Sequence, residues 1–267
     1  MTGKLKGRVA LVTGGARGIG AASAQALAAA GAAVLITDVL DDEGHATAAR
    51  IAEMGALAGY FRHDVRDEAA WLAAVSETEK RFGGLDILLN NAGIFALKPM
   101  SQTSIEEFRY MQSINVDGVF LGMKSVLPSI AKRSHQWSGG GSIINLSSVA
   151  GIAGAAFAVP YNASKGAVRL MTKGAALECA QLGLKIRVNS IHPGVIDTAM
   201  GQRVIDEQVA AGAGTANEVR SNLIAIHPLG RMGSAADIAN AVVFLASDDA
   251  AFMTGSEVVV DGGYTAR

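Results

Sequence analysis

The feature of this sequence that most restricts its fold is an alternation of strand-length apolar runs with helix-length amphipathic segments. The runs are continuously apolar, which is typical of strands buried on both faces of a parallel sheet. Strands are predicted at Arg8–Thr13, Ala33–Asp38, Ala56–Arg62, Leu85–Asn90, Ser142–Leu146, Ile186–Ile191 and Glu257–Val260. Helices are predicted at Ile19–Ala30, Glu43–Met54, Glu68–Phe82, Ser104–Ile130, Tyr161–Leu182 and Ala235–Ala246. The pattern predicts an α/β fold with helices on both faces of the sheet.

The chain shows no linker and no internal repeat, so residues 1–267 are predicted to form a single domain with a Rossmann-like, doubly wound parallel sheet. The longer segment at residues 197–227 is of the kind that forms a substrate lid. The polar, glycine-rich segment Ser134–Gly141 is expected to be a surface excursion. Asp86 is expected to support the turns that bind a cofactor.

Composition narrows the function classes. Half of the 267 residues are hydrophobic and 18% are charged, which supports a large aliphatic core. The net charge of −1 and the lack of a long basic run argue against nucleic acid or a membrane as partner. No signal-peptide pattern and no membrane-length apolar run is seen, and Cys179 is the only cysteine, so a cytoplasmic protein is expected. The scattered histidines predict no metal site.

A glycine-rich turn follows the first predicted strand. Gly14, Gly18 and Gly20 have the spacing Gly-x-x-x-Gly-x-Gly, and Ile19 lies among them. Backbone without side chains lets a pyrophosphate approach the N–H groups of a helix N-terminus. A tight strand-to-helix turn without a ligand is the alternative. Asp38 ends the second strand, where a carboxylate binds the adenosine ribose hydroxyls, although it also suits a turn former or a helix cap.

Two residues of the predicted site favour different dinucleotides. Arg17 could reach a 2′-phosphate and would favour NADP, whereas Asp38 would repel that phosphate. Val39 and Leu40 supply no compensating cation. The balance predicts NAD.

The chemistry-bearing pattern is Tyr161-Asn162-Ala163-Ser164-Lys165, with Ser148 thirteen residues before the tyrosine. Residues four apart share one face of a helix, so phenol and ammonium lie side by side. A close ammonium favours the phenolate and lowers the tyrosine pKa, as a base near neutral pH requires. Taken alone, the pattern is far more typical of a solvated helix face, and only the other motifs reverse this interpretation.

Together these motifs resemble the short-chain dehydrogenase/reductase family over essentially the whole chain. The matching pieces are Thr13–Gly20, Asp64-Val65, Asn90–Gly93, Asn115, Ser147-Ser148, Tyr161–Lys165 and Pro193–Thr198. Within the family, residues 97–99, 165–170, 189–194 and 261–266 look like those of cyclic-alcohol dehydrogenases of the cyclopentanol type, and next like bacterial hydroxysteroid dehydrogenases.

The resemblance implies roles for individual residues. Ser148 holds the substrate oxygen, Tyr161 exchanges the proton, Lys165 lowers the pKa of Tyr161 and holds the nicotinamide ribose, and Asn115 anchors a water that links Lys165 to solvent. The implied cofactor-binding residues are Gly14, Arg17, Gly18, Ile19, Gly20, Asp38, Asp64, Val65, Asn91, Ala92, Gly93, Tyr161, Lys165, Pro193, Gly194, Val195, Ile196 and Thr198.

The predicted substrate pocket is apolar and carries no evident anchoring cation. Its predicted residues are Phe95, Val149, Phe157 and Met200. We therefore expect an NAD-dependent oxidoreductase that interconverts a cyclic or bulky, apolar secondary alcohol and its ketone. A 3-oxoacyl thioester (acyl carrier protein) reductase is the alternative, and it would want NADPH and a basic patch. A non-catalytic nucleotide-binding regulator would be expected to lose Ser148, Tyr161 or Lys165.

The expected partners are a small-molecule substrate and further copies of the chain. The helical patterns at Ser104–Ile130 and Tyr161–Leu182 are apolar on more than one face. One face covers the sheet and the other needs a partner. The resemblance adds that such helices pair across two-fold axes and that the C-terminal strand builds a second interface, which together predict a homotetramer.

Overall fold

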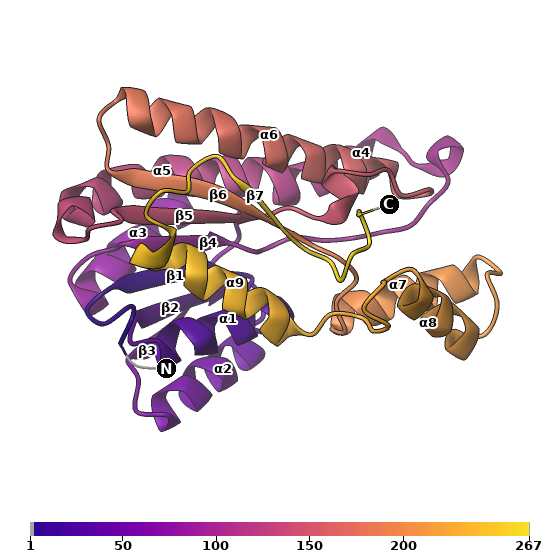
Figure 1. The fold of residues 1–267 in the computed structure, drawn as a ribbon, viewed down its shortest axis with the longest axis horizontal. Coiled ribbons are helices and arrows are strands. Elements are labelled where there is room, and N and C mark those ends of the chain that lie inside the picture. Colours follow the sequence, from indigo (N-terminus) through magenta and orange to yellow (C-terminus); the bar gives the residue numbers. More distant parts are fainter. Residues whose placement is uncertain (1–2, 267) are drawn as a thin grey trace.

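The computed structural model describes residues 3–266, which form one α/β domain around a seven-stranded parallel sheet (Figure 1). The strand order is β3-β2-β1-β4-β5-β6-β7, and every neighbouring pair is parallel. The strands are β1 (Val9–Thr13), β2 (Ala33–Asp38), β3 (Ala58–Arg62), β4 (Ile87–Asn90), β5 (Gly141–Leu146), β6 (Ile186–Pro193) and β7 (Glu257–Val260). The order reverses between β1 and β4, and in doubly wound sheets ligands bind beyond the carboxyl ends of the strands at this switch point. The predicted fold class is confirmed.

Helices cover both faces of the sheet (Figure 1). They are α1 (Gly18–Ala29), α2 (Asp41–Glu53), α3 (Glu68–Phe82), α4 (Ile105–Gln112), α5 (Gly118–Arg133), α6 (Val159–Gln181), α7 (Ala199–Ala210), α8 (Ala216–Ala225) and α9 (Ala235–Ala246). One apolar core joins the sheet to α1, α2 and α9, and a second joins it to α3, α5 and α6. Successive strand residues alternate between them, since Leu11 belongs to the second core and Val12 to the first.

Local signals explain why α3 has the bounds that the sequence predicts. The Asp67 carboxylate accepts hydrogen bonds from Ala69 N and Ala70 N, which caps the first turn. Gly83 ends the helix at φ 81°, a left-handed conformation that favours glycine.

The single helix predicted at Ser104–Ile130 is wrong, because the structure divides it. A capping box of Ser104 and Glu107 starts α4, and a π-helical turn at Ser113–Asp117 separates α4 from α5. A π turn adds one residue to the helical ladder and changes the direction of the side chains that it carries. Here it carries Asn115, whose buried side chain bonds the backbone of Ile94.

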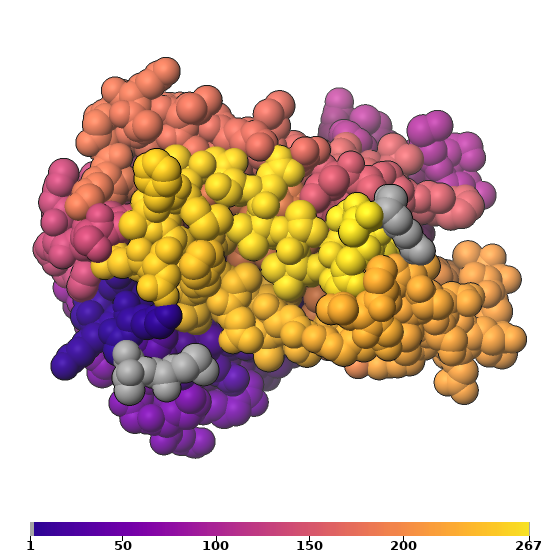
Figure 2. Space-filling view, viewed as in Figure 1, coloured from indigo at the N-terminus to yellow at the C-terminus, as the bar shows by residue number. Residues whose placement is uncertain are grey.

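The segment at residues 197–227 contains two helices. Thr198 caps α7, and a capping box of Thr215 and Glu218 starts α8. A small apolar cluster of Ile205, Val219, Leu223 and Met232 holds the two helices together. They extend beyond the carboxyl ends of the strands and form the orange lobe at the right of Figures 1 and 2.

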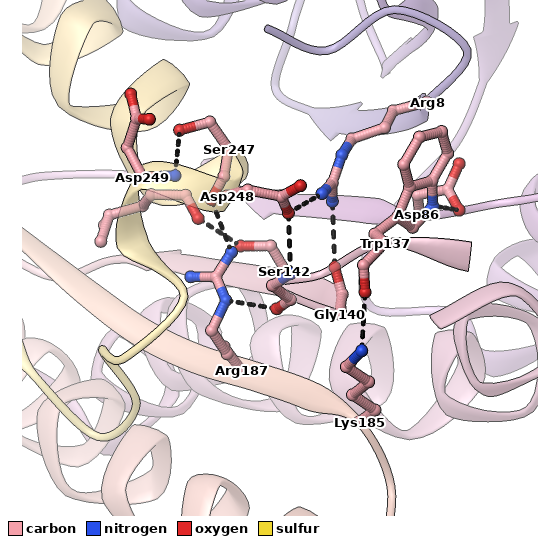
Figure 3. Close-up of polar contacts among 12 residues, drawn as sticks. Arg8, Asp86, Trp137, Gly140, Ser142, Lys185, Arg187, Ser247, Asp248 and Asp249 are labelled. Carbon is pink, nitrogen blue, oxygen red and sulfur yellow. Dashed lines mark hydrogen bonds and ion pairs between the residues drawn. The ribbon is translucent and has the colours of Figure 1, made fainter. Parts of the chain in front are cut away.

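Asp86 lies at the amino end of β4, so its expected support of the cofactor-binding turns is wrong. Its carboxylate accepts hydrogen bonds from Val9 N at 2.8 Å, Trp137 Nε1 at 2.8 Å and Arg133 Nε at 3.0 Å. A residue that precedes a parallel strand lies at the edge opposite to the turns that follow the strands. Asp86 therefore ties together the amino edge of the sheet (Figure 3).

The segment Ser134–Gly141 lies at the same edge of the sheet. It was expected to be a surface excursion, but its glycine end is buried. Arg8 donates to Gly140 O at 3.0 Å, and Arg187 Nε donates to Gly139 O at 2.7 Å. Asp248 accepts from Gly139 N at 2.9 Å and pairs with Arg8 (Figure 3). Two buried arginines thus fasten the segment to the strands.

Candidate active site

The glycine turn lies between β1 and α1 and is closely packed. Gly14 and Gly18 have φ values of 60° and 58°, which favour glycine. A Cβ at Gly14 would lie 2.8 Å from Ala92 Cα, and one at Gly20 would lie 2.2 Å from Gly14 O. The turn therefore presents bare backbone and the first N–H groups of α1, which fit the pyrophosphate of a dinucleotide.

The Asn91-Ala92 turn after β4 is fastened to the glycine turn. Asn91 Nδ2 donates to Thr13 O and to Gly14 O, both at 2.9 Å. Thr13 Oγ1 accepts from Asn91 N and from Ala92 N, both at 3.1 Å. Gly93 follows, and a Cβ there would lie 3.7 Å from Lys165 Nζ. The predicted residues of the two turns are therefore brought together, next to Lys165.

Asp38 lies against the glycine turn. Its carboxylate accepts from Ala16 N at 3.1 Å and from Val39 N at 2.8 Å. The predicted position beside the ribose hydroxyls fits this geometry. Arg17 is exposed. A cation that the sequence argument missed is nearby, because Arg62 donates to Val39 O at 2.9 Å and pairs with Asp41.

Asp64 and Val65 follow β3 at the same edge. Val65 is buried, and the Asp64 carboxylate forms a two-pronged ion pair with Arg66. The Arg66 hydrogen bond lowers the pKa of Asp64. An adenine amino group would therefore meet a carboxylate that already has one partner.

Ser148 and Tyr161 meet at the carboxyl end of β5. Ser148 caps a short turn through Ala150 N at 3.1 Å, and Tyr161 lies in the first turn of α6. A side-chain hydrogen bond joins the two hydroxyl groups. Lys165, one turn further along α6, is buried and donates to Leu146 O at 2.8 Å. The structure brings together the residues predicted to hold the substrate oxygen and move its proton.

Burial sets the charge state of the pair. It raises the pKa of Tyr161 to about 12, although the Ser148 hydrogen bond acts in the opposite direction. It lowers the pKa of Lys165 to about 8. The spacing of Tyr161 and Lys165 predicts a lowered pKa for the tyrosine. Burial instead has the larger effect, so the phenol is protonated at neutral pH.

Asn115 connects the π turn to this group. Its Oδ1 accepts from Ile94 N at 2.8 Å, and its Nδ2 donates to Ile94 O at 3.0 Å and to Ser164 Oγ at 3.1 Å. Ser164 immediately precedes Lys165. The Asn115 side chain therefore holds α6 and the segment after β4 at a fixed distance.

The segment Gly194–Thr198 leads from β6 to α7. Gly194 N donates to Val260 O at 3.0 Å, and Ile196 forms a bridge with Gly233. A Cβ at Gly18 would lie 3.7 Å from the Thr198 methyl carbon. The segment and the glycine turn therefore face each other at the site.

Of the predicted pocket residues, Phe95 packs its ring edge-on against Tyr161 at a centroid distance of 5.0 Å. Val149 is buried beside Ser148. Phe157 is exposed and has φ 61°, an uncommon conformation for a phenylalanine. Met200 is partly exposed at the start of α7.

Contacts around the pocket connect its walls. Lys98 N donates to Phe157 O at 2.7 Å, which joins the two loops that carry the aromatic residues. Glu207 of α7 accepts from Leu97 N at 2.6 Å. The Lys98 ammonium is paired with Glu107. Glu207 belongs to no recognisable motif, so its contact with Leu97 could not be predicted from the sequence.

No helix within residues 3–266 is long and apolar enough to cross a membrane. Nor does that part of the chain group three or more His, Cys, Asp or Glu side chains where they could hold a metal ion.

Comparison with known proteins connects this geometry to a family. The family model described as "Enoyl-(Acyl carrier protein) reductase" matches residues 14–265. The chain belongs to the short-chain dehydrogenase/reductase family. Members of this family use NAD or NADP.

Relatives at similar identity cover essentially the whole chain. A cyclopentanol dehydrogenase of Comamonas sp. (strain NCIMB 9872) is 43% identical over 99% of this chain and 100% of its own. An NADP-dependent (R)-specific alcohol dehydrogenase of Lentilactobacillus kefiri is 41% identical over both full lengths. A 3-alpha-(or 20-beta)-hydroxysteroid dehydrogenase of Mycobacterium bovis is 42% identical over 100% of this chain and 92% of its own. Their shared class supports an oxidoreductase that acts on a CH–OH group.

Comparison with solved structures agrees with this family assignment. The crystal structure of levodione reductase matches with a TM-score of 0.90 and 36% identity, and the match covers 98% of this chain and 99% of that one. The predicted family resemblance is confirmed, including its nearness to cyclopentanol and hydroxysteroid dehydrogenases.

Proposed function

We propose that this chain is an NAD-dependent oxidoreductase that interconverts an apolar, cyclic or bulky secondary alcohol and its ketone. The observation that carries the proposal is the hydrogen-bonded pair of Ser148 and Tyr161, which lies at the carboxyl edge of the sheet near a turn suited to a dinucleotide. Bound NAD⁺ is the hydride acceptor of the reaction.

The protein's own groups handle the oxygen and its proton. Ser148 donates a hydrogen bond to the substrate oxygen, and Tyr161 Oη takes the alcohol proton during oxidation and returns it during reduction. The Lys165 ammonium lies 5.7 Å from the centre of the Tyr161 ring, where a positive charge favours the phenolate. Asn115 positions α6, and the proposed water that it anchors links Lys165 to solvent.

Asp38 supports the choice of NAD. Its carboxylate lies at the glycine turn, where a 2′-phosphate would meet a like charge. The cationic alternative, Arg17, is exposed, and Arg62 is already paired with Asp41. The relative of Lentilactobacillus kefiri is NADP-dependent, so a preference of this chain for NADP is the opposite outcome of the test below.

Apolar surroundings support the substrate class. Phe95 lies against Tyr161, and Val149 adjoins Ser148. An apolar ring gains about 25 cal/mol per Å² of surface that it buries. Lys98, whose backbone N–H bonds Phe157 O, has its ammonium paired with Glu107 and offers no free charge to an acidic substrate. We also propose that α7 and α8 act as the lid, with Glu207 joining α7 to Leu97 when it is closed.

The test is a kinetic panel with NAD⁺ and NADP⁺. Cyclopentanol, cyclohexanol, a hydroxysteroid, an aryl alkyl carbinol and a 3-hydroxyacyl thioester are compared by kcat/KM. We expect the cyclic alcohols or the hydroxysteroid to exceed the thioester, with NAD⁺ preferred. A clear advantage for the thioester would contradict the proposed substrate and favour a carrier-protein reductase. No turnover of any alcohol, despite dinucleotide binding, would favour a regulator.

A further inference from the structure

His227 joins α8 to the segment that follows β6. Its side chain is buried, and both ring nitrogens are hydrogen-bonded. Nδ1 lies 2.6 Å from Leu223 O, and Nε2 lies 3.2 Å from Val195 N. A carbonyl oxygen can only accept and an amide N–H can only donate. The ring must therefore carry its proton on Nδ1 and use Nε2 as the acceptor.

The glycine before Val195 allows this approach. A Cβ at Gly194 would lie 2.9 Å from His227 Nε2, so a side chain there would displace the imidazole. On another side, the Tyr264 ring lies 5.6 Å from the imidazole, centroid to centroid. The imidazole is thus held in one place and presents its lone pair to the backbone.

The backbone of residues 195–197 is held by two residues, Gly233 and His227. Gly233 N donates to Val195 O at 2.9 Å, and Asp197 N donates to Gly233 O at 2.8 Å. Gly233 therefore fixes the carbonyl of Val195 and the amide of Asp197. His227 fixes the amide of Val195, and so controls the peptide plane that precedes this residue.

A cavity of about 110 Å³ adjoins the contact. Its wall includes Gly194, Val195, Ile196 and His227. Close packing holds most of a protein interior in place, but a cavity wall lacks neighbours on one side. The hydrogen bond from Val195 N to His227 Nε2 therefore holds this part of the backbone in place, as close packing does elsewhere in the interior.

We propose that His227 is a positioning residue for the dinucleotide site, which acts by holding the Val195 amide and thereby the segment up to Thr198. Because Nδ1 is bonded to Leu223 on α8, the same ring makes the position of this segment depend on that of the lid. This inference rests on the proposed function of the segment as part of the dinucleotide site.

The two ring nitrogens can be replaced separately. In His227→Gln, the amide oxygen reaches the place of Nε2 and can still accept from Val195. In His227→Asn, the amide nitrogen lies near the place of Nδ1 and keeps only the bond to Leu223. His227→Phe keeps neither. The readouts are the Kd of NADH, hydrogen exchange of the peptide containing Val195 in the ligand-free protein, the unfolding midpoint, and kcat and KM for a ketone.

We expect His227→Asn and His227→Phe to weaken NADH binding about fivefold, the effect of one lost hydrogen bond, and to speed exchange in the Val195 peptide. His227→Gln should stay close to wild type in both measurements. A merely structural role would lower the unfolding midpoint without this order among the variants.

Equal NADH affinities for His227→Gln and His227→Asn would overturn the proposal, and this comparison stands even if His227→Phe does not fold. Failure of the wild-type protein to bind NADH would instead overturn the proposed function. Normal NADH binding that does not depend on which nitrogen is replaced would overturn only the role of His227.

Discussion

The Lys165 ammonium lies 5.7 Å from the centre of the Tyr161 ring, while its hydrogen bond goes to the carbonyl of Leu146. The end of β5 therefore fixes the position of the ammonium beside the phenol ring. Burial opposes that charge and favours the neutral form of both groups. At neutral pH the tyrosine thus carries its proton.

The first prediction concerns the pH dependence of the two directions. Ketone reduction needs a protonated Tyr161, and the pKa of about 12 supplies this form at neutral pH. Alcohol oxidation needs the phenolate, so its rate should rise with pH. We expect kcat/KM for oxidation to increase from pH 7 to pH 9, while that for reduction holds or falls. Initial rates in both directions test this, and oxidation that slows over this range would contradict it.

The second prediction concerns stability. Lys165 has a pKa of about 8 in the folded chain and about 10.5 when unfolded, so between these values the unfolded chain binds the extra proton. The free energy of unfolding should therefore rise with pH in this window. Relative to Lys165→Met, the wild type should gain about 2 kcal/mol from pH 7 to pH 10. Denaturant unfolding of both proteins measures it, and a constant difference would show that the folded-state pKa is not lowered.

The third prediction concerns the proton-transfer residue. Tyr161→Phe removes one hydroxyl and should lower turnover by about 10²- to 10⁴-fold. The Kd of NADH should change little, because the glycine turn and Asp38 lie elsewhere. Tyr110→Phe, at an exposed tyrosine, is the matched control. If Tyr161→Phe keeps more than about a tenth of the activity, Tyr161 is not the general base.

The fourth prediction concerns the choice of dinucleotide. Asp38→Ala removes the charge at the glycine turn and should narrow or reverse the preference for NAD. Asp41→Asn should also raise NADP affinity, because it releases Arg62, which already bonds Val39 O. Adding Arg62→Gln should abolish that gain. Direct titration with both dinucleotides measures these effects. A wild type that prefers NADP would show that Asp38 does not decide the choice.

The fifth prediction concerns assembly. Large apolar side chains remain exposed on α5 and α6, namely Phe120, Leu170 and Leu177, and others lie on and before β7, including Phe252 and Val259. Two such surfaces on one chain suit a dimer of dimers. We expect a homotetramer in sedimentation at micromolar concentration. Leu170→Glu should dissociate it, whereas Leu72→Glu on α3 should not. A monomeric wild type would contradict the prediction.

Periodicity was enough to predict the sheet and most of its helices. The bounds of β2, α3, α9 and β7 match the predictions, because each element ends at a clear local signal or a change from apolar to polar residues. The division of α4 from α5 could not be read in this way. It depends on the contact of Asn115 with Ile94, which lies 21 residues away in sequence.

The candidate site was likewise predictable from the sequence only in part. Motifs located Ser148, Tyr161 and Lys165, because one helix and one strand end bring them together. The pKa of Tyr161 could not be predicted, since it depends on how deeply tertiary packing buries the phenol. The contact of His227 could not be predicted either, because it also depends on tertiary packing. Its partner Val195 lies 32 residues away, and no spacing rule connects them.

The ion pair between Arg8 and Asp248 at the amino edge of the sheet has a consequence for how the chain folds. The two residues are 240 positions apart, and α1 likewise packs against α9. During synthesis, β1 can align with β2 as soon as that strand has left the ribosome. The guanidinium of Arg8 can form its ion pair with Asp248 only when nearly the whole polypeptide has been made. Completion of the amino-terminal half is therefore a late, long-range event, and a nascent chain that stops before residue 248 leaves this arginine without its carboxylate.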